Sequence, residues 1–98
     1  MLKKELDEKN LKKAHKRLSA IDHPNRIEII KMLSEKPKMN VTQIYTKLQI
    51  EQAAASHHLS LLRINGILNA KREGKEIYYS LNQANLDHMI DCINKCVE

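Results

Sequence analysis

The sequence predicts a mainly α-helical fold with a small β-hairpin, consisting of about five helices and two strands. Apolar residues recur at intervals of three and four along five stretches, which is typical of amphipathic helices. Ile77, Tyr79 and Leu81 instead alternate with their neighbours as in a half-buried strand, and Gly74 precedes them as a turn residue. No linker or internal repeat interrupts these elements, so we expect residues 1–98 to form a single domain.

The first helix is expected over residues 2–21. Its apolar stripe consists of Leu2, Leu6, Leu11, Ala14, Leu18 and Ile21. Much of its remaining surface is lysine. A chain of this size buries only about two-thirds of its unfolded surface by itself. A stripe this long on a terminal helix is therefore expected to pack against another subunit.

Capping signals mark the start of the next two helices. Pro24 suits the first position of the second helix, with Asp22 or His23 before it as the cap. The residues around Pro24 indicate no more than a favourable helix start. Asn40 opens a third helix of about seven residues, and Gln43 follows three residues later as in a capping box.

The fourth helix is expected over residues 51–65 and is ended by Gly66. Its core face is formed by Ala54, Ala55, Leu59 and Leu62. The opposite face carries short polar groups and one cation, on Gln52, Ala53, Ser56, His57, Ser60 and Arg63. Such a face can enter a major groove and hydrogen-bond base edges, although on an isolated helix it is more often simply solvated. A short helix, a tight turn without the frequent glycine and this longer helix together give a helix-turn-helix pattern.

The hairpin is expected around Gly74, with Lys71, Arg72 and Lys75 clustered at its tip. Alone it would be an ordinary solvated hairpin. Beside a helix-turn-helix, its cations can meet phosphates or enter a minor groove. A last helix is expected over residues 82–98, with an apolar stripe made of Leu86, Met89, Ile90, Ile93 and Val97.

The composition favours duplex DNA among possible nucleic-acid partners. The 17 Lys and Arg residues exceed the 12 Asp and Glu residues, and the net charge of +5 suits a polyanion, although proteins that bind none often share it. Single-strand and RNA readers stack bases on aromatic side chains, whereas this chain has no Trp or Phe. No apolar run reaches the roughly 20 residues of a membrane span, and the charged start has no signal-peptide core. We therefore expect a cytoplasmic protein.

Four blocks of the sequence carry a resemblance to a known family. They are I-D-H-P-N-R-I-E-I-I-K-M-L (21–33), V-T-Q-I-Y-T-K-L (41–48), S-H-H-L-S-L-L-R-I-N-G-I-L (56–68) and R-E-G-K-E-I-Y-Y-S-L (72–81). In this order and spacing the chain resembles the ArsR/SmtB family of bacterial transcriptional repressors, which are winged helix-turn-helix proteins. No single block is decisive, because the helix-turn-helix block is common to many regulators, but the four together are specific.

The resemblance implies a homodimeric, sequence-specific repressor that binds double-stranded DNA. The first and last helices would form the dimer interface, residues 51–65 would be the recognition helix in the major groove, and residues 69–80 would be the wing. A two-fold dimer presents two recognition helices about one DNA turn apart, so the operator should be an imperfect inverted repeat. Such a regulator would be cytoplasmic, and nucleoid-associated when bound.

The resemblance also implies which residues touch DNA. Base edges or nearby phosphates would be contacted by Gln52, Ser56, His57 and Ser60. The sugar-phosphate backbone would be contacted by Thr42, Gln43 and Arg63, and also by the wing residues Lys71, Arg72 and Lys75. His58 is expected to support the helix more than to contact DNA. Glu51 departs from the usual Ser or Thr cap, and its carboxylate suits the helix dipole but would repel a nearby phosphate.

No effector site of the family matches this sequence. Residues 38–42 lack the Cys-x-Cys of one metal site, residues 87–98 break the ligand pattern of another, and the second helix lacks the cysteine of sulfur-sensing relatives. His88, Cys92 and Cys96 do share a helix face and could hold zinc or a similar ion across a dimer. Core packing of the two cysteines is the simpler interpretation. We therefore expect no cofactor and no resident metal, with a metal- or thiol-responsive sensor as the alternative.

Two other classes of function are considered. A winged helix can serve as a protein–protein interaction module, since fold alone does not fix function, but the cations of the hairpin favour DNA. An enzyme using Ser56 with His57 or His58 is not expected, because neighbouring helix residues point about 100° apart and no carboxylate or phosphate loop accompanies them. The sequence indicates neither the operator, nor the regulated genes, nor an inducer.

Overall fold

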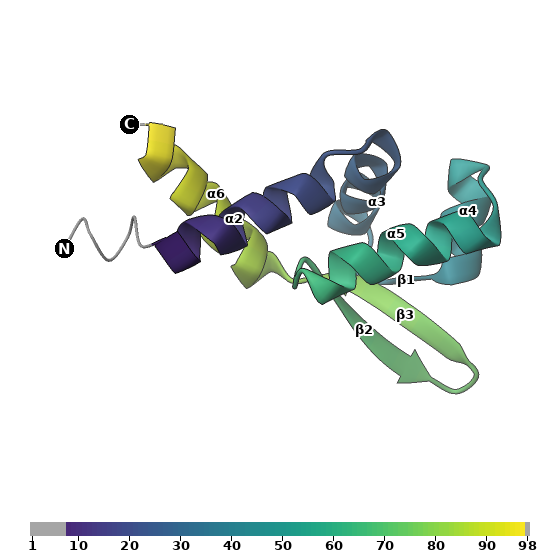
Figure 1. Ribbon diagram of the computed structural model, residues 1–98. Coiled ribbons are helices and arrows are strands. Elements are labelled where there is room, and N and C mark those ends of the chain that lie inside the picture. The colour runs from purple at the N-terminus through teal and green to yellow at the C-terminus, as the bar shows by residue number, and fades with distance from the viewer. Residues whose placement is uncertain (1–7, 98) are drawn as a thin grey trace.

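The computed structural model describes the backbone of residues 8–97 and, within it, the side chains of residues 12, 15–91 and 94. The elements of this part of the chain are α2 (Glu8–Ile21), α3 (Pro24–Glu35), β1 (Met39–Asn40), α4 (Val41–Leu48), α5 (Gln52–Ile64), β2 (Leu68–Glu73), β3 (Glu76–Leu81) and α6 (Gln83–Val97), as Figure 1 shows. The predicted mainly α-helical fold with a hairpin is confirmed. Residues 2–7 of the predicted first helix, and residue 98 of the last, lie outside the described residues.

The helix starts follow the capping signals of the sequence. His23 is the N-cap of α3, and its Nδ1 accepts a hydrogen bond from the backbone N–H of Asn25 at 3.1 Å. Asn40 and Gln43 form the expected capping box of α4, each side chain accepting from the backbone N–H of the other at 2.8 and 2.9 Å. Both helices therefore begin where local chemistry satisfies their first free N–H groups.

The turn between α4 and α5 forms without glycine because Gln49 takes the left-handed conformation. Its φ and ψ are 58° and 46°, and its backbone N–H reaches the carbonyls of the last turn of α4. A non-glycine residue in this region costs roughly 1–2 kcal/mol. The short turn places α5 directly after α4 and completes the helix-turn-helix.

The sheet has three strands in the order β1-β3-β2, where two strands were predicted. Met39 pairs with Tyr79 and Asn40 with Tyr78, so β1 is antiparallel to β3. A strand of two residues has no measurable alternation, and its pairing partner lies far away in the sequence. The wing is therefore anchored to the segment that begins α4.

The core lies where α3, α4 and α5 meet the base of the sheet. Its fully buried side chains include Ile29, Ile44, Leu59 and Leu62. Tyr79 and Leu81 pack against this core as the alternation predicted, but Ile77 is exposed because it lies towards the hairpin tip, beyond the core.

Helices α2 and α6 lie side by side at the end of the molecule away from α4 (Figure 1). Met89 of α6 is buried, whereas Leu18 of α2 and Ile90 of α6 are each 46% exposed. Each helix thus turns one apolar side inward and leaves another uncovered in this protomer. None of the described helices combines the length and the apolar character that crossing a lipid bilayer demands.

Candidate nucleic-acid interface

The polar face predicted for the fourth helix is the solvent face of α5. The buried side chains of α5 are Ala55, His58, Leu59 and Leu62. Its exposed side chains include all six predicted members of the polar face, Gln52, Ala53, Ser56, His57, Ser60 and Arg63. The core residues therefore fix which side of α5 points outward.

This solvent face also includes Ile64, which the sequence reading missed. Ile64 is 73% exposed, and it follows His57 by seven residues and Ser60 by four, which places the three on one side of the helix. The helical spacing could have revealed it. The face is thus polar along most of its length and apolar at its C-terminal end.

The N-terminus of α5 has no side-chain cap. Glu51 occupies the N-cap position with extended backbone, and its carboxylate makes no capping hydrogen bond. Glu51 therefore leaves the first N–H groups of α5 without the side-chain partner that a Ser or Thr cap would supply. The carboxylate does lie near the positive end of the helix dipole, which favours it.

The two residues predicted to reach the DNA backbone from α4, Thr42 and Gln43, are both exposed in its first turn. The side-chain oxygen of Gln43 already accepts the N–H of Asn40 at 2.9 Å. Only the amide nitrogen of Gln43 is then left to donate a hydrogen bond to a phosphate.

The hairpin holds its cations on two faces. Lys71, Arg72 and Lys75 are all exposed, but consecutive strand residues point to opposite sides. Lys71 pairs across the sheet with Tyr78, and Arg72 pairs with Ile77. Lys71 and Arg72 therefore lie near the hairpin tip but project on opposite sides of the wing.

A fourth cation, Lys38, contacts the hairpin and was not predicted. Its ammonium forms an ion pair with Glu73 at 2.5 Å and lies 4.7 Å from the centre of the Tyr78 ring. The hydrogen bond from Lys38 lowers the pKa of Glu73 below its ordinary value against the opposing effect of burial, and the charges of Lys38 and Lys71 act in the same direction as that bond. Glu73 is thus a carboxylate whose charge is balanced by its neighbours.

His58 is enclosed beneath α5 and holds it to two other helices. It is 7% exposed, and its Nδ1 accepts a hydrogen bond from Nε of Arg26 at 3.0 Å. Arg26 also donates from Nη1 to the carbonyl of Ala20 at 3.1 Å. The His23 ring lies 4.6 Å from the His58 ring, centre to centre. His58 therefore supports α5, as expected, and does not face solvent.

The charge state of His58 follows from its donor. A guanidinium only donates hydrogen bonds, so Nδ1 of His58 must be unprotonated to accept from Arg26. Burial lowers the pKa of His58 below the ordinary histidine value, and the nearby charges of His23, Arg26 and His57 lower it further. The contact between α3 and α5 is therefore built on a neutral imidazole.

The described side chains do not include all three candidate metal ligands of the last helix. His88 is exposed, and the side chains of Cys92 and Cys96 lie outside the described set. Among the side chains that the structure does describe, no three from His, Cys, Asp and Glu are grouped as a metal ion requires. A metal or thiol site there stays a prediction.

The helix-turn-helix, the exposed polar face of α5 and the basic hairpin define a winged helix-turn-helix protein that binds DNA. Residues 23–70 match the family described as "Bacterial regulatory protein, arsR family". The chain is 36% identical to the transcriptional repressor PagR of Bacillus anthracis over 77 residues, which cover 79% of this chain and 77% of PagR. It belongs to the ArsR family, and it is a DNA-binding transcriptional regulator.

Other comparisons agree with this assignment. The transcriptional activator HlyU of Vibrio cholerae is 31% identical over 90% of this chain and 81% of its own length. The crystal structure of PagR superposes with a TM-score of 0.74 at 32% identity, covering 89% of this chain and 99% of that one. The HlyU structure gives a TM-score of 0.75 at 30% identity, with 91% and 96% coverage. The fold is thus shared along nearly the whole chain.

Proposed function

We propose that the protein is a homodimeric repressor that reads a duplex operator with α5 in the major groove and with the β2–β3 hairpin as a wing. The observation that carries this proposal is the solvent face of α5, which displays short donors and acceptors with one cation over about three turns. Groups of this size reach base edges without filling the groove.

The proposed contacts divide by chemistry. Base edges and neighbouring phosphates are met by Gln52, Ser56, His57 and Ser60, all of which are exposed on α5. The sugar-phosphate backbone is met by Thr42, Gln43 and Arg63, and on the wing by Lys71, Arg72 and Lys75. Because Lys71 and Arg72 point to opposite sides of the wing, we expect them to meet different phosphates.

A dimer through α2 and α6 is the second part of the proposal. Leu18 and Ile90 are large apolar side chains left half exposed on two helices that lie side by side. A second copy related by a two-fold axis would cover both and would present two α5 helices to one face of DNA. The operator is then an imperfect inverted repeat. The whole chain, residues 1–98, serves as one domain with a DNA-reading centre and terminal dimerisation helices.

Whether the protein represses or activates transcription is inferred from the mechanism of operator binding. PagR is named a repressor and HlyU an activator, so similarity alone leaves both outcomes. A dimer lying on an operator can exclude a polymerase by occupying the site, which needs no surface beyond those described above. We therefore propose repression, exerted in the cytoplasm on the nucleoid.

The first experiment selects duplexes bound by the purified protein from a random pool and compares them with random duplexes over a range of salt concentrations. We expect affinity to fall steeply with salt, because phosphate contacts release counterions, and we expect light scattering to give twice the protomer mass. A protein–protein docking module would show no salt-dependent binding to any duplex. A monomer that ignores every duplex at low salt contradicts the proposal.

Variants then test the residue roles. Ser56→Ala or His57→Ala should weaken the selected duplex by about tenfold and leave random DNA nearly unchanged, since a base contact is worth about 1–3 kcal/mol. Lys71→Ala combined with Arg72→Ala should weaken both duplexes about equally. Ser34→Ala, at an exposed serine of α3, is the control and should change neither. If all variants leave the footprint intact, the assigned contacts are wrong.

A further inference from the structure

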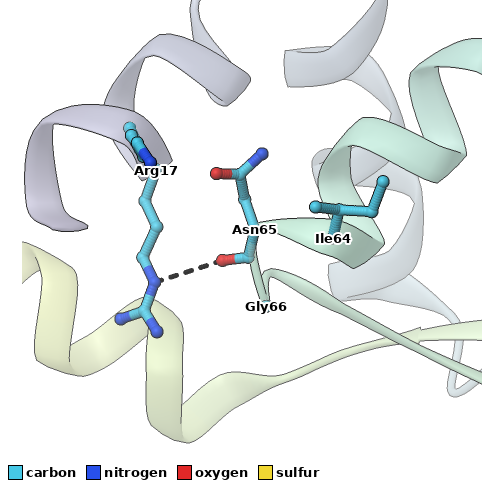
Figure 2. Close-up of a pocket in the computed structure, with 5 residues that line it drawn as sticks. Arg17, Ile64, Asn65 and Gly66 are labelled. Carbon is cyan, nitrogen blue, oxygen red and sulfur yellow. Dashed lines mark hydrogen bonds between the residues drawn. The ribbon is translucent and has the colours of Figure 1, made fainter.

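A basic hollow lies between α2 and the C-terminal end of α5. It consists of two adjoining depressions of about 270 and 350 Å³, which share Lys16 and Asn65 in their walls. Figure 2 shows the first of them, with Arg17 reaching from α2 to the end of α5. None of the DNA contacts proposed above uses this surface.

The lining of the hollow is cationic. Lys16 and Arg17 line the first depression, and His15 and Arg26 join Lys16 in the second. No Asp or Glu is among the described residues that line either one. The exposed ammonium of Lys16 has no hydrogen bond or ion pair within the described part of the chain. Such a surface attracts an anion, and phosphate offers several strong acceptors to it.

The second cation of the first depression is fixed in place. Nε of Arg17 donates to the carbonyl of Asn65 at 3.1 Å (Figure 2), so the guanidinium is held at the end of α5 with its terminal nitrogens still able to donate. The guanidinium lies close to Gly66, because a Cβ placed on Gly66 would be 3.5 Å from Nη2 of Arg17, an ordinary contact distance. A held guanidinium loses less conformational entropy on binding than a mobile side chain.

The position of the hollow connects it to the DNA-reading face. Ile64 lines the hollow and lies on the same side of α5 as His57 and Ser60. A duplex with α5 in its major groove has a sugar-phosphate backbone along each side of that helix. Lys16 does not lie on the proposed dimer surface, because Lys16 and Leu18 are two residues apart on α2 and point about 200° apart.

We propose that this hollow binds a phosphate group, with Lys16 as the principal cation and Arg17 as the held second donor. The phosphate belongs either to the DNA backbone beside the C-terminal end of α5 or to a free phosphate compound. The first source rests on the proposed function, and the second does not. Both require the same pair of cations, so one variant tests both.

The test variant is Lys16→Gln, and Lys31→Gln is its matched control. Both lysines are exposed, but Lys31 lies on the solvent side of α3, away from the buried Ile29, Met32 and Leu33. Lys16 is preferred to Arg17 because Arg17 also fastens α5 to α2. A melting temperature of both variants equal to that of the unsubstituted protein would show that the fold is unchanged.

The first measurement adds inorganic phosphate to the DNA-free protein and follows backbone amide shifts, with chloride at matched ionic strength as the reference. We expect saturable shifts at residues 16, 17, 65 and 66 that are lost in Lys16→Gln and kept in Lys31→Gln. The second measures duplex affinity against salt. If the backbone supplies the phosphate, Lys16→Gln should lower the slope of log affinity against log salt by about one relative to Lys31→Gln.

The outcomes separate the sources. Localised amide shifts together with a lower slope support a backbone phosphate, and a lower slope alone supports the same source. Localised shifts with an unchanged slope support a free phosphate compound. Localised shifts in a protein that binds no duplex would keep the site and refute the proposed function. Neither localised shifts nor a slope change in Lys16→Gln would overturn the phosphate site.

Discussion

Replacing Arg26 with alanine should destabilise the protein more than replacing any other arginine with alanine. Arg26 sits near the start of α3 and joins three helices, through the carbonyl of Ala20 in α2 and through Nδ1 of His58 in α5. Arg26→Ala removes both hydrogen bonds. It also leaves the nearly buried Nδ1 of His58 without its donor.

The size of the loss follows from these contacts. A hydrogen bond from a charged donor contributes about 1.5–3 kcal/mol, and a cation at a helix C-terminus adds about 0.3–1 kcal/mol. We expect the free energy of unfolding to fall by about 2–4 kcal/mol. Each kcal/mol corresponds to roughly 4–8 °C in Tm for a domain of this size, so the change is readily measured.

The assay is urea unfolding at a fixed protomer concentration, because subunit association would also shift the midpoint. Arg63→Ala is the matched control: Arg63 is exposed on α5, and the change should stay within about 0.5 kcal/mol. In a double-mutant cycle, Arg26→Ala and His58→Ala should couple by about 1.5–3 kcal/mol. Equal costs for the two arginine variants, or additive effects of Arg26→Ala and His58→Ala, would refute the role given to Arg26.

Three further predictions follow from the same structure. Because folding lowers the pKa of His58, the neutral imidazole contributes stability that is fully present above the ordinary pKa of 6.5 and is lost as the pH falls through the lowered pKa of the folded state. Urea unfolding from pH 8 to 5 should show this decline, and His58→Gln should reduce it. Gly66→Ala should cost more than Gly74→Ala in the same assay, since both have positive φ but only a Cβ at Gly66 meets a neighbour, Nδ2 of Asn85 at 3.0 Å; equal costs would contradict this. Glu51→Ser should raise the free energy of unfolding by about 0.5–1 kcal/mol by capping α5, and should also strengthen DNA binding, whereas a loss of both would show that the carboxylate has another role.

Features set by nearby residues were predictable from the sequence. The starts of α3 and α4 follow from Pro24 and from the Asn40–Gln43 capping box, because each signal lies within one turn of the helix that it begins. The solvent face of α5 followed from helical spacing of its apolar residues. These predictions needed no knowledge of tertiary contacts.

Features set by distant residues were not predictable. The pairing of Met39 with Tyr79 and the hydrogen bond of Arg26 to His58 each join positions more than thirty residues apart. No local pattern marks either partner, so β1 was missed and the segment around Pro24 was interpreted only as a helix start. The opposite directions of Lys71 and Arg72, by contrast, follow from strand geometry and could have been foreseen.

The pairing of β1 with β3 joins the proposed wing to the segment that begins the helix-turn-helix. Asn40 is at once a rung of the sheet, opposite Tyr78, and the residue that caps α4. A displacement of the hairpin would therefore also displace the N-cap residue of α4. In the DNA complex proposed above, this link would fix the distance between α5 and the wing. We therefore expect bending or unwinding of the duplex to change affinity even where every base is kept.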